Sequence, residues 1–126
     1  MLFWALILCS NSQKVKFEVI GLSYYPYWIK KDYTETIEDL EYNLNDMASR
    51  YGKEVMVVEV GGEDHLIQNT FDMLKATIKA VKAVPNQKGL GVIYWEPQGE
   101  KSWSNYSLSA WQSDGKPSAA LDAFKH

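Results

Sequence analysis

The sequence predicts an α/β fold built on parallel strands. Three short runs that favour strands alternate with two longer stretches whose apolar residues recur at helical spacing. Strands that alternate with helices of this length imply parallel pairing through right-handed crossovers. The run Val55–Val60 holds five apolar residues, four of them valine, which suits a strand covered on both faces.

Taken in order, the elements form repeated strand–loop–helix units. Residues 17–23 are expected to be a strand, followed by an aromatic loop and a helix that Thr36 caps and Gly52 ends. The strand at 55–60 leads through Gly61-Gly62 to a second helix, which ends before Pro85. Residues 89–95 form the third strand, and a short helical tail is expected at 119–124. The two helices carry apolar stripes at Ile37, Leu40, Leu44, Met47 and Tyr51, and at Ile67, Phe71, Leu74, Ile78 and Val81.

Composition limits the protein class. The 126 residues make at most one ordinary domain, and 46% hydrophobic against 23% charged residues is enough to build a core. A net charge of −3 without a basic cluster argues against nucleic acid as a partner. The single cysteine, Cys9, excludes an internal disulfide and a cysteine-based zinc site.

Residues 1–14 do not resemble the rest of the chain. Nine apolar residues precede a polar stretch, and this run is too short to span a membrane. A signal peptide would carry a basic start and a small-residue cleavage site, and neither is clear here. The expected explanations are a degenerate signal, a short amphipathic element or a false start, with the domain proper at 15–126.

Aromatic and acidic residues follow all three predicted strands. They are Tyr25 and Trp28 after the first strand, Glu59 at the end of the second, and Trp95 and Glu96 after the third. The C-terminal ends of parallel strands meet at one edge, where α/β folds place their chemistry. We therefore expect Glu59 to be a functional carboxylate, the alternative being a strand-end acid that points into water.

Strand alternation assigns side chains to the two faces of the sheet. If Glu59 faces the strand interior, Val55 and Val57 share its side. On the third strand Trp95 then shares a side with Gly91 and Ile93. The residues expected to face the helices are Met56, Val58 and Tyr94.

Several longer motifs, taken in order, point to a known family. They are Gly21–Trp28, Asn43–Asn45 with Arg50–Lys53, Val58-Glu59, Tyr94–Pro97, and the tail Ser113–Pro117 with Leu121–Phe124. This series resembles family 53 of the glycoside hydrolases, the arabinogalactan endo-β-1,4-galactanases. The resemblance runs from about Val15 to Phe124, nearly the whole chain.

The resemblance implies a (β/α)8 barrel that cleaves internal β-1,4-galactosyl bonds in galactan or arabinogalactan with retention of configuration. The chain would supply strands six to eight of that barrel. Glu59 matches the nucleophile at the end of the seventh strand, and Tyr25 matches a tyrosine at the active centre. Trp95 matches the tryptophan under the cleaved sugar, while Trp28 and Glu96 match neighbouring motif positions. The family also implies secretion or a periplasmic or cell-surface location.

Retention needs two carboxyl groups roughly 5 Å apart. In this family the proton donor belongs to an Asn-Glu pair on the fourth strand, and no Asn-Glu dipeptide occurs here. A whole barrel takes about 250 residues. We therefore expect a truncated barrel, inactive by itself, in which Glu63, Asp64 and Glu96 are loop acids.

Two other classes of function remain open at this point. A non-catalytic galactan-binding protein would keep an aromatic platform of Tyr25, Trp28 and Trp95 without the acid. An α/β interaction module would bind no ligand at all. No cofactor is expected. The resemblance leaves calcium open, because some family members hold it in loops at this face. The candidate for it here is the short acidic turn Glu63–His65, which we interpret as a solvated loop.

Overall fold

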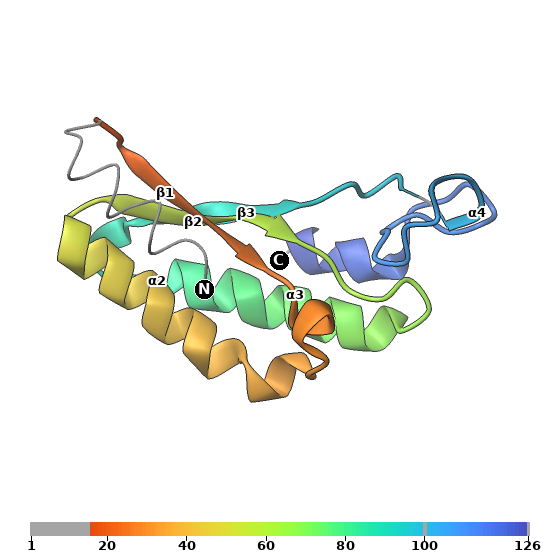
Figure 1. Ribbon diagram of the computed structural model, residues 1–126, viewed down its shortest axis with the longest axis horizontal. Coiled ribbons are helices and arrows are strands. Elements are labelled where there is room, and N and C mark those ends of the chain that lie inside the picture. The colour runs from red at the N-terminus through yellow and green to blue at the C-terminus, as the bar shows by residue number, and fades with distance from the viewer. Residues whose placement is uncertain (1–15, 100, 126) are drawn as a thin grey trace.

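The protein is a three-stranded parallel sheet with helices on one side (Figure 1). The computed structural model describes residues 16–99 and 101–125, so the segment 1–14 set apart above lies outside the described residues. The strands are β1 (Val19–Tyr24), β2 (Glu54–Val60) and β3 (Gly89–Tyr94), with β2 in the centre. The predicted α/β class with parallel strands is confirmed.

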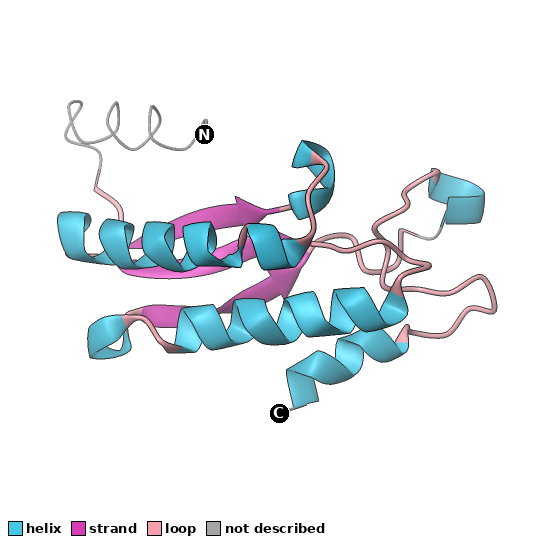
Figure 2. Cartoon of the chain, turned by 90° about the horizontal axis from the view of Figure 1, so that it is seen from below, coloured by secondary structure: helices cyan, strands magenta, loops and turns pink. Residues whose placement is uncertain are grey.

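Two long helices cover one face of this sheet. Helix α2 (Ile37–Tyr51) and helix α3 (Ile67–Lys82) lie side by side and run along the strands (Figure 2). Gly52 ends α2 with a left-handed φ of 65°, as expected for a C-terminal glycine. The shorter elements are η1 (Pro26–Ile29), η2 (Tyr33–Glu35), η3 (Pro85–Gln87), α4 (Lys101–Ser104) and η4 (Ala119–Lys125).

The predicted helix boundaries hold, but two details differ. Thr36 precedes α2 as expected, yet its side chain makes no capping bond to the helix. Its hydroxyl instead pairs with the Tyr24 hydroxyl at 2.9 Å, which ties the end of β1 to the start of α2. The helical tail is the 3₁₀ helix η4, which packs against α3.

The core lies between the sheet and the two helices. Val55, Val57 and Val60 of β2 are fully buried, and Leu44 of α2 and Leu74 of α3 are buried with them. Burying side chains of this size stabilises a fold by roughly 1.5–3 kcal/mol each. The valine-rich run is therefore the centre of the core.

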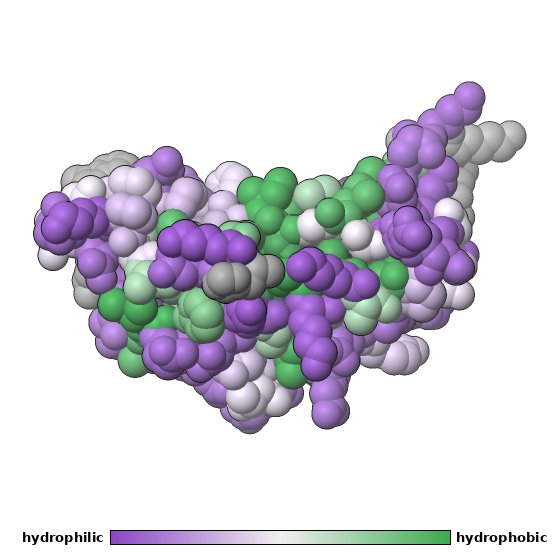
Figure 3. All heavy atoms as spheres, turned by 180° about the vertical axis from the view of Figure 1, so that it is seen from behind, coloured by the Kyte–Doolittle hydropathy of each residue, from purple (hydrophilic) through white to green (hydrophobic). Residues whose placement is uncertain are grey.

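The opposite side of the sheet carries no helix among the described residues. Ile93 is 51% exposed there, and a Cβ added at Gly91 would meet open space. In the view from behind, hydrophobic residues gather along the middle of this upper side (Figure 3). This surface is called the open face below.

Strict alternation wrongly placed the β2 valines. Val55 and Val57 face the helices, whereas Met56 and Val58 lie on the open side. The cause is a β-bulge, because Leu22 pairs with Val57 but the next residue of β1 pairs with Glu59. The extra residue, Val58, shifts the alternation, so two successive residues of β2 share the open face.

On β3 the predicted sides are confirmed. Tyr94 is buried, while Ile93 and Trp95 are exposed.

The two glycines of β3 should respond differently to alanine. A Cβ at Gly89 would overlap the Val81 carbonyl oxygen at the end of α3, whereas Gly91 has open space. We expect Gly89→Ala to lower the free energy of unfolding by about 1–3 kcal/mol, as overpacking does. Gly91→Ala should change it by less than about 0.5 kcal/mol. Urea denaturation measures both, and equal losses would contradict the close approach of α3 to β3.

Candidate functional site

All three strands end at the same edge of the molecule. Their arrowheads in Figure 1 point toward the loops that follow β3. The Trp95 backbone N–H donates to the Val60 carbonyl at 3.0 Å, so the pairing of β2 with β3 continues past Tyr94. Parallel pairing thus brings the end of β1, Glu59 and Trp95 to one place, as the sequence predicted.

The Tyr94 hydroxyl holds this edge together. It donates to the Leu108 carbonyl at 2.8 Å and accepts from the Gly62 N–H at 3.3 Å. Burial raises the pKa of Tyr94 from 10.0 to about 12, while its hydrogen bond to Gly62 acts in the opposite direction. One buried group therefore fastens the loop after β2 and the segment around Leu108 to the end of β3.

Glycines let the loops approach each other closely at this edge. A Cβ at Gly61 would lie 3.3 Å from Cε1 of Tyr25 and 3.2 Å from the Leu108 carbonyl oxygen. A Cβ at Gly62 would overlap the Thr70 hydroxyl of α3. Gly61-Gly62 therefore does more than end the strand, because it makes room for the tyrosine beside Glu59.

Glu59 lies opposite Ser23 on the open side and is partly exposed. Its charge, together with Tyr106, raises the pKa of Tyr25, although burial is the largest cause. Burial is the main cause that raises the pKa of Tyr106, and the charges of Glu96 and Glu59 raise it further. The site thus contains a carboxylate with two neutral tyrosine hydroxyls near it.

The sequence predicted that Tyr25 and Glu59 lie at this edge, but it gave no indication of Tyr106. It stands in a polar loop outside any periodic stretch, and no sequence pattern marks it. The sequence analysis placed Tyr94 on the side that faces the helices. It did not predict that the Tyr94 hydroxyl would bond to the loops at the strand ends.

The other predicted residues line the same edge with exposed side chains. Trp28 is 63% exposed and Trp95 is 45% exposed. Trp28 meets the Tyr27 ring edge-to-face, with ring centroids 4.8 Å apart. Glu96 is exposed with a left-handed φ of 47°, and its carbonyl accepts the Gly99 N–H at 2.9 Å. The two tryptophans therefore present rings that a sugar can stack on.

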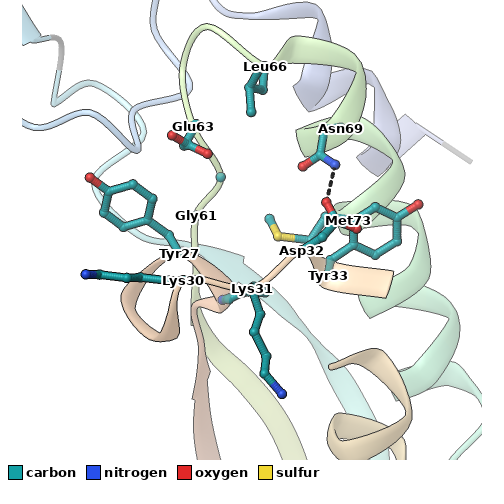
Figure 4. Close-up of a pocket in the computed structure, with 12 residues that line it drawn as sticks. Tyr27, Lys30, Lys31, Asp32, Tyr33, Gly61, Glu63, Leu66, Asn69 and Met73 are labelled. Carbon is teal, nitrogen blue, oxygen red and sulfur yellow. Dashed lines mark hydrogen bonds between the residues drawn. The ribbon is translucent and has the colours of Figure 1, made fainter. Parts of the chain in front are cut away.

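A cavity of about 370 Å³ lies behind the Gly61-Gly62 turn (Figure 4). Tyr27 and Glu63 border it, and Asn69 of α3 donates to the Asp32 carboxylate at 2.7 Å across it. None of the predicted site residues lines it. Glu63 therefore borders this cavity, whereas Glu59, Tyr25, Trp28, Trp95 and Glu96 do not.

Neither a metal cluster nor a membrane helix is found in the described part of the chain. Residues 16–99 and 101–125 contain no group of three histidine, cysteine or acidic side chains suited to a metal ion. Asp64 and His65 contact each other at 3.4 Å in the turn considered for calcium. In the same residues no helix has the length and apolar character to cross a membrane.

Comparison with known proteins identifies the family. The model of glycosyl hydrolase family 53 matches residues 3–66 and 64–124. The chain belongs to glycosyl hydrolase family 53. The match begins inside the first 14 residues, and the boundary at residue 15 stays a prediction.

Relatives of this family 53 chain include named galactanases. An uncharacterised protein of Niallia circulans is 32% identical over 116 residues, covering 71% of this chain and 30% of that protein. The arabinogalactan endo-β-1,4-galactanase of Humicola insolens is 30% identical over 96 residues, covering 64% and 28%. The endo-β-1,4-galactanase of Bacillus subtilis is 28% identical over 131 residues, covering 83% and 29%. The chain thus spans less than a third of the length of these relatives.

Solved structures show the same fold. A fungal β-1,4-galactanase matches 98% of this chain and 43% of its own, with a TM-score of 0.75 at 20% identity. The family 53 catalytic domain of Ignisphaera aggregans matches 98% and 42%, with a TM-score of 0.78 at 19% identity. The three βα units therefore have the arrangement found in part of a (β/α)8 barrel, as predicted.

Removing the Tyr94 hydroxyl should destabilise the loops at the strand ends. Tyr94→Phe leaves the Leu108 carbonyl and the Gly62 N–H without this partner. We expect the free energy of unfolding to fall by about 1–3 kcal/mol. Tyr42→Phe, which alters a tyrosine that is 67% exposed on α2, should change it by less than about 0.5 kcal/mol. Similar losses in the two variants, measured by urea denaturation at neutral pH, would contradict the anchoring role.

The raised pKa of Tyr94 predicts a loss of stability in alkali. In the unfolded chain the hydroxyl ionises near its ordinary value of 10.0, whereas in the folded chain it keeps its proton up to about 12. The folded state therefore binds more protons between these pH values, and the free energy of unfolding falls as the pH rises through them. Its contribution to that fall is about 2–3 kcal/mol. Urea titrations at pH 9 to 12 should show a shallower fall for Tyr94→Phe than for the wild type.

Proposed function

We propose that this chain carries the nucleophile and part of the sugar-binding surface of a retaining endo-β-1,4-galactanase. The observation that supports this most directly is the place of Glu59, at the end of the central strand, on the open side and near Tyr25. The names of the Humicola and Bacillus relatives give the substrate, a β-1,4-linked galactan. In a barrel the open side of a strand faces the interior, and the strand's C-terminal end faces the active-site mouth.

The proposed mechanism begins with the Glu59 carboxylate. It attacks the anomeric carbon of a galactosyl unit, and the bond to the next sugar breaks to give a covalent glycosyl-enzyme. Tyr25 remains protonated beside it, because burial and the nearby Glu59 charge raise its pKa. Tyr25 is thus a neutral hydrogen-bond donor available to the carboxylate or the sugar.

The exposed aromatic residues have the binding role in this proposal. Trp95 stands next to Glu59's strand, so its ring suits the apolar face of the galactose unit being cleaved. Trp28 extends the surface on the loop after β1, and Glu96 accepts hydrogen bonds from sugar hydroxyls. These contacts need neither a cofactor nor a metal, and they suit a polysaccharide encountered outside the cytoplasm.

The leaving sugar also needs a proton donor. Among the described acids near the strand ends, Glu63 lines the cavity behind the turn and Asp64 contacts His65. Glu96 lies near Tyr106, but on the exposed side of the loop after β3. We propose that none of these acids serves as donor, so the chain by itself does not hydrolyse galactan.

A second function rests on the same exposed rings. Trp28 and Trp95 are accessible to a sugar. Without a proton donor for the leaving sugar, the chain would bind galactan but would not cleave it. Measurable binding of galactan oligosaccharides in a chain whose Glu59 never reacts would favour this function.

The nucleophile can be tested without the donor by an activated inhibitor. In 2,4-dinitrophenyl 2-deoxy-2-fluoro-β-galactobioside the leaving group departs without protonation, and the fluorine slows breakdown of the glycosyl-enzyme. We expect intact-protein mass spectrometry to show one added glycosyl group on the wild type and on Glu96→Gln. Peptide mapping should place it on Glu59, and Glu59→Gln should show none.

Two results would contradict these proposals. Labelling that survives in Glu59→Gln would assign the nucleophile elsewhere. Release of galacto-oligosaccharides from β-1,4-galactan by the unmodified chain would show that a second carboxyl within it acts as donor.

A further inference from the structure

The cavity behind the Gly61-Gly62 turn is bordered by three separate stretches of the chain. Its volume of about 370 Å³ lies within the range of roughly 300–1,000 Å³ that is usual for small-molecule sites. The lining side chains used below are Tyr27, Lys30, Lys31 and Asp32 from the segment η1 to η2, Glu63 after the turn, and Asn69 and Met73 of α3.

Asp32 holds one side of this cavity in a fixed arrangement. Its carboxylate accepts the Thr34 N–H at 3.0 Å, the Thr34 hydroxyl at 2.6 Å and the Asn69 amide N–H at 2.7 Å. These hydrogen bonds, the one from the Thr34 side chain above all, lower the pKa of Asp32 and keep it ionised. The amide nitrogen of Asn69 is thereby occupied, and its oxygen is directed toward the opposite side of the cavity (Figure 4). Asn69 therefore presents an oriented hydrogen-bond acceptor.

The opposite side carries polar groups whose bonding capacity is unused. Within residues 16–99 and 101–125, neither the Glu63 carboxylate nor the Tyr27 hydroxyl has a hydrogen-bond partner. The Tyr27 ring and the Met73 side chain add apolar surface between these polar groups and Asn69 (Figure 4). A few placed polar groups on an otherwise apolar lining are typical of a small-molecule site.

The charges around the cavity balance. Two ammonium groups, on Lys30 and Lys31, oppose the carboxylates of Asp32 and Glu63. An anion such as phosphate would be repelled by the two carboxylates, and a metal ion by the two ammonium groups. The lining therefore suits a neutral molecule that has several hydroxyls and an apolar face.

We propose that this cavity binds one neutral sugar unit, whose apolar face lies on the Tyr27 ring and whose hydroxyls donate to Glu63 and Asn69. The Tyr27 ring meets Trp28 edge-to-face at 4.8 Å, so the cavity adjoins the exposed tryptophan surface. A unit held here is bound without being cleaved, because Glu59 does not line the cavity. The choice of a sugar rests on the function proposed above, whereas the cavity and its unpaired groups do not.

NMR of chains labelled with ¹³C at the methionine methyl groups reports on the cavity directly. Met73 borders the cavity, whereas Met47 is buried in the core on α2 and serves as the internal reference. We expect methyl β-galactopyranoside to shift the Met73 signal to saturation and to leave the Met47 signal unchanged. Sodium phosphate should shift neither signal.

Two pairs of variants identify the contacts with the sugar. Glu63→Ala and Asn69→Ala should each weaken binding about fivefold, as the loss of one hydrogen bond does. Their controls, Glu41→Ala and Asn45→Ala, remove the same kinds of side chain from the exposed surface of α2 and should leave the affinity unchanged. Because the Glu63 carboxylate has no partner in the described residues, Glu63→Ala should also keep the stability of the wild type in urea denaturation.

Three results would overturn the proposal. They are a Met73 signal that does not saturate with the sugar, saturation by phosphate instead, and equal affinities in the two variants and their controls.

The same experiments separate this proposal from the proposed function. A chain that is never labelled at Glu59 but whose Met73 signal saturates would refute the nucleophile alone. A chain that is labelled at Glu59 without any Met73 response would refute the sugar site in the cavity alone.

Discussion

The parallel pairing of β2 with both neighbours is the constraint on which the site depends. Because β2 lies between β1 and β3, the ends of the three strands have a common direction and one edge. The buried valines of β2 fix the strand against α2 and α3. With the covered face occupied by the core, functional side chains have room only on the open side and at the strand ends.

The loops at that edge are held in place by a side chain of the core. The Tyr94 ring is part of the hydrophobic core. Its hydroxyl bonds to the backbone of Gly62 and Leu108, in the loops that border Glu59 and Tyr25. A buried hydroxyl with satisfied bonds stabilises loops that otherwise lack regular structure. Core packing therefore sets the arrangement of the candidate site, although most of the predicted site side chains are exposed.

The open face is consistent with three βα units arranged as in part of a barrel. The helices cover only one side of the sheet, and the structures of galactanases match this chain over less than half of their length. Hydrophobic residues such as Ile93 are exposed where a complete barrel would pack further strands against them. Glu59 lies on the same open side, and the proposed mechanism needs a second carboxyl in addition to it.

The sequence by itself determined the elements and their ends, because periodicity, Gly52 and the valine run act locally. It also placed Glu59, Tyr25 and Trp95 at one edge, since parallel strands allow no other outcome. Tertiary structure alone decided which face each β2 residue occupies, because the bulge at Val58 arises from pairing with β1. It likewise decided the place of Tyr106, whose ring lies against Gly99 through loop packing that no spacing in the sequence records.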